Sequence, residues 1–186
     1  MFATRSDKKE KYYKSWRIVF AFFAAVLGGV VCGLCSMYFA TSSFSIEMFF
    51  SYFSNPYITV FNLVPPVLLS AIFYLIFNRA VWSYVATNAL VMIPTLINYY
   101  KIALRGDCFI AEDMALADEA SQMLSSYDLF IDKRVAVYIA IFVIGTVLLA
   151  VFARGRSRRT VSRYICAAVL VAASVLLAPF YTSDNI

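Results

Sequence analysis

Five long stretches without a charged residue constrain the fold of this chain more than any other feature. A helix needs about 20 predominantly apolar residues to cross the roughly 30 Å hydrocarbon core of a bilayer, and each stretch reaches or approaches that length. Backbone groups in lipid must be hydrogen-bonded within the protein, so we expect helices rather than open strands. The predicted transmembrane helices cover residues 18–40, 57–77, 80–100, 135–153 and 164–181. Because the Asn78-Arg79 turn is tight, we expect the second and third to form an antiparallel hairpin.

The composition agrees with an all-α integral membrane protein. Of the 186 residues, 62% are hydrophobic and only 15% are charged, whereas charged residues make up about 25% of a soluble protein. A soluble domain of this size would expose large apolar patches. The chain also has no histidine, which removes the commonest general base and metal ligand. These observations argue against a self-contained soluble enzyme.

The distribution of charge predicts the orientation. If residues 1–17 are cytoplasmic, then 12 of the 16 basic residues fall on the cytoplasmic side and nine of the 11 acidic residues fall outside. Positive charge next to a span marks its cytoplasmic end. We therefore expect a basic cytoplasmic tail (1–17), a five-helix domain (18–181) and the start of an extracellular tail or linker (182–186). Nucleic acid is not an expected partner, because no soluble scaffold presents the basic clusters.

Small and polar residues inside the spans indicate helix contacts. Gly29 and Gly33 form a small-xxx-small pair beside Gly28, which favours close approach of a second helix. Asn62 and Asn88 have two interpretations: they hold helices together, or they line a polar groove for a lipid headgroup. The sequence leaves both open.

Between the third and fourth helices, residues 101–134 form a polar outer segment. After Asp113, a plausible N-cap, apolar residues recur at spacings of three and four, which predicts an amphipathic helix lying on the outer leaflet. Its acidic residues could hold Mg²⁺ or Ca²⁺, but a solvated face is the favoured interpretation. The acidic residues concerned are Glu112, Asp113, Asp118 and Glu119.

Lys101 and Arg105 are four residues apart and would share one helix face at the outer boundary. They could anchor the helix to ordinary lipid phosphates. Alternatively, they could grip the phosphate of a substrate lipid, for which arginine offers two parallel hydrogen bonds. Asn98 lies one turn earlier, at the outer edge of the third span.

The pattern Asn98-x-x-Lys101-x-x-x-Arg105-Gly106, followed by Asp113 and Glu119, resembles the membrane region of bacterial lipoteichoic acid synthases and related phosphoglycerol transferases. Those proteins have five transmembrane helices, an outer stretch of this type after the third helix, and then an extracellular sulfatase-like catalytic domain. The sequence departs from the family after Gly106, where a proline is common and this chain has Asp-Cys-Phe.

The resemblance implies a module that anchors such an enzyme in the bacterial plasma membrane and presents a phosphatidylglycerol-type lipid. The implied headgroup-binding residues are Asn98, Lys101, Arg105 and Asp113. The family's threonine nucleophile and its Mn²⁺ ligands (Asp, Glu and His) are expected only in an extracellular catalytic domain that would follow this chain. We therefore expect no catalytic residue, metal site or cofactor in the chain itself, and membrane lipids and that catalytic domain as partners.

The alternative is a stand-alone small membrane protein that carries a lipid or acts as a scaffold for a cell-envelope complex. A channel or ion transporter is disfavoured, because no acidic residue lies inside any predicted span, and intramembrane charges usually mark such pathways.

Overall fold

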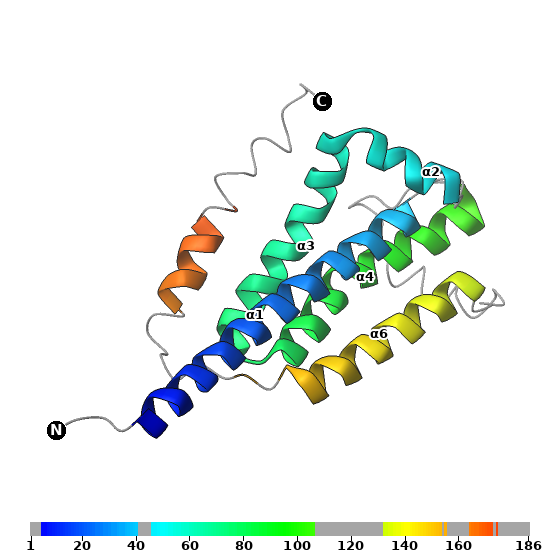
Figure 1. Ribbon diagram of the computed structural model, residues 1–186. Coiled ribbons are helices and arrows are strands. Elements are labelled where there is room, and N and C mark those ends of the chain that lie inside the picture. Colours follow the sequence, from blue (N-terminus) through cyan, green and yellow to red (C-terminus); the bar gives the residue numbers. More distant parts are fainter. Residues whose placement is uncertain are drawn as a thin grey trace, which may run out of the picture.

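The computed structural model is a bundle of helices (Figure 1) and describes residues 5–40, 46–106, 132–153, 155, 164–172 and 174. All regular structure among these residues is helical. A short helix also covers 164–172. The other elements are α1 (Arg5–Ala40), α2 (Ile46–Ser51), the 3-10 helix η1 (Tyr52–Ser54), α3 (Pro56–Phe77), α4 (Ala80–Arg105) and α6 (Lys133–Phe152).

In the described part of the chain, four helices are long and apolar enough to cross a membrane: Trp16–Ala40 within α1, then α3, Ala80–Ala103 within α4, and α6. They coincide with the first four predicted spans, so the prediction of a multi-pass all-α membrane protein is confirmed at this level. The helix at 164–172 covers the first half of the fifth predicted span. The rest of that span lies outside the described residues, so the fifth crossing stays a prediction, as does the orientation.

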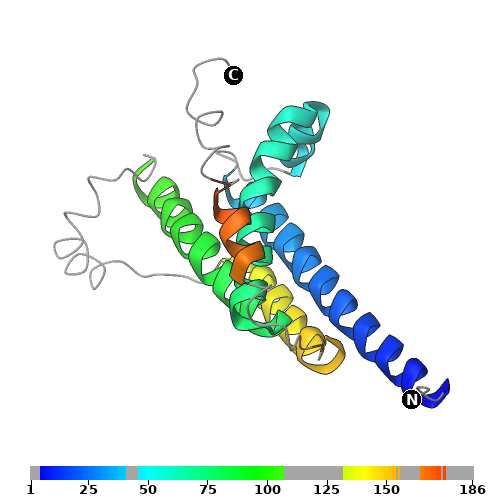
Figure 2. The same cartoon turned by 90° about the vertical axis from the view of Figure 1, so that its left-hand side faces the viewer.

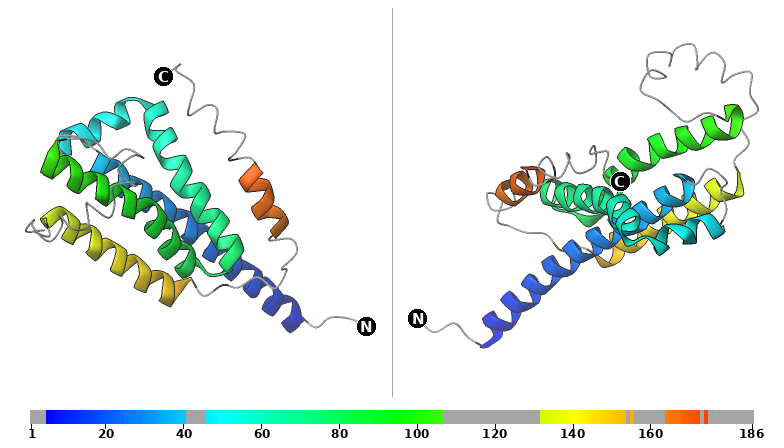
Figure 3. Two further views of the ribbon diagram at one scale, coloured as in Figure 1. Left: turned by 180° about the vertical axis from the view of Figure 1, so that it is seen from behind. Right: turned by 90° about the horizontal axis from the view of Figure 1, so that it is seen from above.

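The helices alternate in direction. In Figures 1 and 2, α1 and α4 run one way and α3 and α6 run the other. The C-terminal ends of α1 and α4, the start of α6 and the short helix α2 therefore meet at one end of the bundle, which we call the α2 end. The helix at 164–172 lies on the opposite side of the bundle from α6, as the view from behind also shows (Figure 3).

A tight turn joins α3 to α4 at the other end. Asn78 adopts a left-handed conformation (φ 57°) and its N–H donates to the Tyr74 carbonyl. Asparagine tolerates this conformation better than other residues with a side chain, apart from aspartate. Because only Asn78 and Arg79 separate the two helices, the expected antiparallel hairpin is confirmed.

At Gly29, α1 approaches α3 closely. A Cβ atom there would lie 2.9 Å from the Pro66 carbonyl oxygen and 2.9 Å from the Ser70 Cβ, so only glycine allows this approach. At the same crossing the Ser70 hydroxyl donates to the Ala25 carbonyl oxygen at 2.6 Å. The expected close helix contact at the glycine pair is confirmed.

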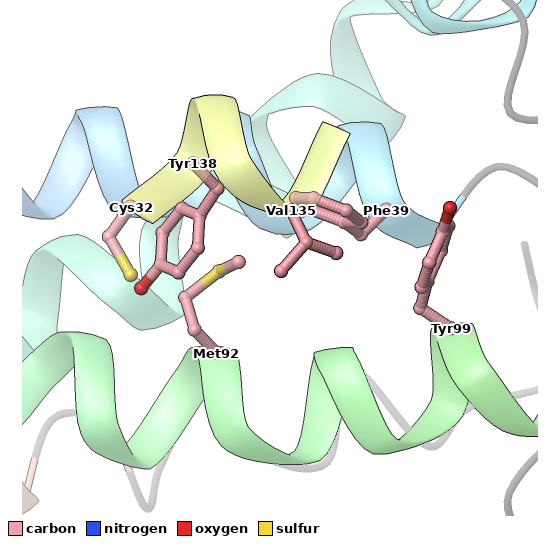
Figure 4. Close-up of a cluster of buried hydrophobic side chains, with 6 residues drawn as sticks. All are labelled: Cys32, Phe39, Met92, Tyr99, Val135 and Tyr138. Atoms are coloured by element: carbon pink, nitrogen blue, oxygen red, sulfur yellow. The ribbon is translucent and has the colours of Figure 1, made fainter. Parts of the chain in front are cut away.

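The core is divided along the bundle. Near the α2 end, side chains from α1, α4 and α6 pack into one cluster (Figure 4): Cys32, Phe39, Met92, Tyr99, Val135 and Tyr138. Toward the opposite end a second cluster consists of Ala21, Ala25, Tyr74, Ala80 and Ala153.

The contact at Gly29 gives a first test. Replacing Gly29 by Val should lower the free energy of unfolding by about 1–3 kcal/mol, the usual cost of overpacking a filled interior. Unfolding of the purified protein in detergent measures this. Leu27→Val on the same helix is the control, because Leu27 is 63% exposed. Equal stability of the two variants would contradict the close packing of α1 on α3.

Candidate functional site

Aromatic contacts join three helices at the α2 end. Phe39 of α1 packs edge-to-face on Tyr99 of α4, with ring centroids 5.1 Å apart, and on Tyr138 of α6 at 6.1 Å. All three side chains are buried, and Figure 4 shows them between the helices. Such aromatic pairs stabilise beyond the area they bury. These contacts hold the ends of α1, α4 and α6 together, and the polar residues described below lie next to them.

A hydrogen bond links α4 to the beginning of α6. The Tyr99 hydroxyl donates to Oδ2 of Asp132, the residue immediately before α6. This hydrogen bond stabilises the ionised carboxylate and is the main reason that the pKa of Asp132 is lowered from its ordinary value. The loop between the two helices lies outside the described residues, so this contact is the direct evidence that their ends are adjacent.

The structure places three of the four predicted headgroup residues on one continuous helix. The third apolar stretch was predicted to end at residue 100, but α4 continues to Arg105 because the next residues are good helix formers. It stops at Gly106, which takes a left-handed conformation (φ 77°). Asn98 and Lys101 are half-buried. Arg105 is the last residue of the helix.

The remaining predicted features of the outer segment lie outside the described residues. These are Asp113 and the amphipathic helix expected after it. Of Arg105, only the backbone is described. Among the described residues, no three or more His, Cys, Asp or Glu side chains form a group that could hold a metal ion, and the acidic group around Asp113 falls in the undescribed segment.

An apolar groove of about 400 Å³ opens between α1, α2 and α6. Leu34 and Tyr38 line it from α1, Phe49 from α2, and Val137 and Ile141 from α6. Its volume falls in the range of about 300–1,000 Å³ that is typical of ligand sites. The groove runs from the α2 end along the outside of the bundle, since Leu34 and Ile141 lie further from that end than Tyr38.

Two cations, Lys133 and Arg134, line this groove at the α2 end. Lys133 is exposed. Arg134 is half-buried, close to the Tyr99 hydroxyl and the Asp132 carboxylate. Both belong to the predicted outer segment 101–134, and the sequence pattern indicated no role for them. Adjacent cations at the start of a span were the available signal, but their position beside a groove depends on how α1 and α6 pack.

The two asparagines for which the sequence left two interpretations have different surroundings. Asn88 is buried; its amide donates to the Tyr84 carbonyl at 2.9 Å and its oxygen accepts from the Tyr138 hydroxyl at 3.1 Å. It therefore connects α4 to α6, as the packing interpretation predicts. Asn62 is exposed and donates to the Ile58 carbonyl of its own helix.

No protein-family model, curated protein or solved structure matches this chain significantly. The resemblance to lipoteichoic acid synthases therefore stays a prediction based on the motif at Asn98–Gly106 and the topology.

The contact between Tyr99 and Asp132 predicts a pH dependence of stability. Tyr99→Phe should destabilise the protein near neutral pH, where Asp132 is ionised. The difference in stability between the variant and the wild type should become smaller as the pH falls below about 4. The sign follows from the lowered pKa of Asp132: the stabilisation exists above its ordinary pKa and is lost when the carboxylate is protonated. Thermal midpoints across this range measure the effect.

The control is Tyr57→Phe, because Tyr57 also lies toward the α2 end but is 72% exposed. It should change the midpoint little at any pH. If Tyr99→Phe lowers the thermal midpoint by the same amount at every pH, the Tyr99 hydroxyl does not act through Asp132.

Proposed function

We propose that this chain is the membrane-anchoring and lipid-presenting module of a phosphoglycerol transferase of the lipoteichoic acid synthase type. It crosses the bacterial plasma membrane several times and holds an anionic lipid of the phosphatidylglycerol type at the outer surface. The module is not catalytic by itself. An extracellular catalytic domain acts on the phosphodiester of the lipid.

The observation that carries the proposal is the extension of α4 beyond its apolar part. Asn98, Lys101 and Arg105 are spaced by three and four residues on one uninterrupted helix, so they share one face of it. The candidate span within α4 ends at Ala103, so in this proposal the face lies at the membrane boundary. Lipid phosphates lie at that depth, and outward-facing cations are the minority under the positive-inside rule.

The surroundings of this face also support lipid binding. The α2 end has further cations, Lys133 and Arg134, beside an apolar groove. Glu47 and Asp132 lie at the same end, so the charges partly offset one another. Cations at the membrane boundary next to an apolar groove suit a lipid, which has an anionic headgroup and hydrocarbon chains.

Chemistry is assigned to the catalytic domain and not to this module. In the family that the chain resembles, a threonine nucleophile and Mn²⁺ perform phosphoglycerol transfer. The described residues of this chain offer no group of metal ligands, and the sequence has no histidine. The chain's own contribution in this proposal is to bind and orient the lipid.

The alternative is a stand-alone membrane protein that carries a lipid or acts as a scaffold for a cell-envelope complex. Lipid binding at α4 suits both functions. The coding sequence after Ile186 discriminates between them. A long reading frame with histidines and a threonine-containing metal motif supports the transferase module, whereas a stop codon supports the alternative.

The cations of α4 provide the test of lipid binding. In Lys101→Gln/Arg105→Gln, affinity for phosphatidylglycerol should fall by about tenfold or more, because each cation near an anionic lipid surface contributes about 1 kcal/mol. Native mass spectrometry with titrated lipid measures the affinity. Phosphatidylcholine, which has no net charge, should show a much smaller change.

Arg79→Gln is the matched control, since Arg79 is an exposed cation in the turn at the opposite end of the bundle. It should retain the wild-type preference for phosphatidylglycerol. The proposal fails if the double variant binds phosphatidylglycerol as the wild type does.

A further inference from the structure

We propose that the groove between α1, α2 and α6 is a specific site for one acyl chain of an anionic glycerophospholipid, with the lipid phosphate at Lys133 and Arg134. The inference rests on the proposed function, because it gives the lipid-presenting module a second lipid-binding region, separate from the α4 cations. It also assigns a role to two residues that the motif on α4 does not include.

The shape of the groove fits a hydrocarbon chain. Its walls come from three helices and are apolar apart from the two cations and the polar groups of Cys35 and the tyrosines. Leu34 and Ile141 lie inside the candidate spans of α1 and α6, whereas Lys133 is the first residue of its span. The groove therefore extends from the membrane boundary into the hydrocarbon layer, over the same depth as the acyl chain of a lipid.

The charge at the groove entrance fits a phosphodiester. Arg134 can donate two parallel hydrogen bonds to a phosphate, and Lys133 supplies a second, more flexible positive charge. Asp132 offsets part of this charge, but Oδ2 of its carboxylate accepts from the Tyr99 hydroxyl. Glu47 belongs to α2 and is not among the residues that line the groove. The first backbone amides of α6 interact with the Asp132 carboxylate, so the attraction of a phosphate to this position comes from the side chains of Lys133 and Arg134.

An aromatic contact holds α2 at the groove. Phe49 packs edge-to-face on Tyr38, with ring centroids 5.9 Å apart, so the short helix forms one wall. Tyrosine is common at the headgroup level, where its ring faces apolar neighbours and its hydroxyl faces polar ones. Tyr38, which lies near Arg134, therefore marks the depth at which the headgroup and the acyl chain of the lipid would meet, whereas the Tyr138 hydroxyl is bonded to Asn88 inside the bundle.

The α4 cations and the groove can be tested separately. The described lining residues of the groove belong to α1, α2 and α6, and none of them comes from α4. Tyr99 packs toward Phe39, whereas Asn98, Lys101 and Arg105 cluster on a different face of α4 by their helical spacing. Substituting the cations of one region therefore leaves those of the other in place.

The experiment uses the full chain in nanodiscs that contain phosphatidylglycerol with a photoreactive group at the end of one acyl chain. Cross-linked peptides are identified by mass spectrometry. In the wild type we expect cross-links concentrated on α1 around Leu34 and on α6 around Ile141. Cross-links spread evenly over the outward faces of α6 would overturn the proposal. So would cross-links joining two copies of the chain through the groove, because the occupant would then be protein.

Two variants test the parts of the groove that would hold the acyl chain and the headgroup of the lipid. Val137→Trp fills the groove and should reduce cross-linking at Ile141 about tenfold. Val143→Trp adds the same side chain at an exposed position of α6 that does not line the groove and should leave cross-linking unchanged. Lys133→Gln/Arg134→Gln should remove the preference for phosphatidylglycerol over phosphatidylcholine at the groove while the chain still cross-links. This double variant alters only residues at the groove entrance, so it provides a test even if Val137→Trp does not fold.

The outcomes separate this inference from the proposed function. If Lys101→Gln/Arg105→Gln weakens phosphatidylglycerol binding but the groove variants do not, the inference is wrong and the proposed function stands. If the groove variants reduce cross-linking while Lys101→Gln/Arg105→Gln binds as the wild type, the role given to α4 is wrong and the groove is the lipid site. If neither set affects binding, both are wrong.

Discussion

The described bundle depends on the close approach of α1 to its neighbours. α1 packs against α3 and α4 along much of its apolar length, and Gly28 and Gly29 lie where those helices cross it. In lipid, the apolar surfaces of two helices gain little from leaving the solvent, so association depends on van der Waals contact and hydrogen bonds at short range. Glycine allows both: the backbones meet, and the Ser70 hydroxyl reaches the Ala25 carbonyl.

This packing has consequences at the α2 end. Because α1 is held against α4, Phe39 reaches Tyr99, and Tyr99 in turn reaches Asp132. α6 packs less extensively, mainly against α4 and to a smaller extent against α1. The groove lies along the edge where α1, α2 and α6 meet. The candidate lipid site thus results from tight packing on one side of α1 and looser packing on the other.

The polar side chains also fall into two groups, those buried between helices and those at the helix ends. Buried polar side chains such as Asn88 and Ser83 bond to neighbouring helices or to their own backbone, which is the arrangement expected for residues that hold helices together in lipid. Cations instead gather at the ends of the helices, where charged groups remain hydrated. Of these, Lys133 and Arg134 border the groove, while Lys101 and Arg105 belong to the last turns of α4.

Much of the fold could be predicted from the sequence. The absence of charge over long stretches predicted the four spans that the structure describes, since a backbone in lipid has few alternatives to a helix. The short Asn78–Arg79 connection predicted the hairpin, and the glycine pair predicted a close contact without identifying α3 as the partner. The end of α4 was less predictable, because hydropathy falls at Lys101 while helix propensity continues to Gly106.

The candidate site was predicted only in part. Spacing along one helix is a local property, so Asn98, Lys101 and Arg105 could be grouped from the sequence. The groove could not, because Leu34, Phe49 and Ile141 are far apart in the chain and meet only through packing. The sequence by itself thus determined which segments are helical and apolar and which cations lie at their ends. The tertiary structure decided which helices touch and where a gap remains between them, because side-chain contacts over long sequence distances leave no periodic pattern in the chain.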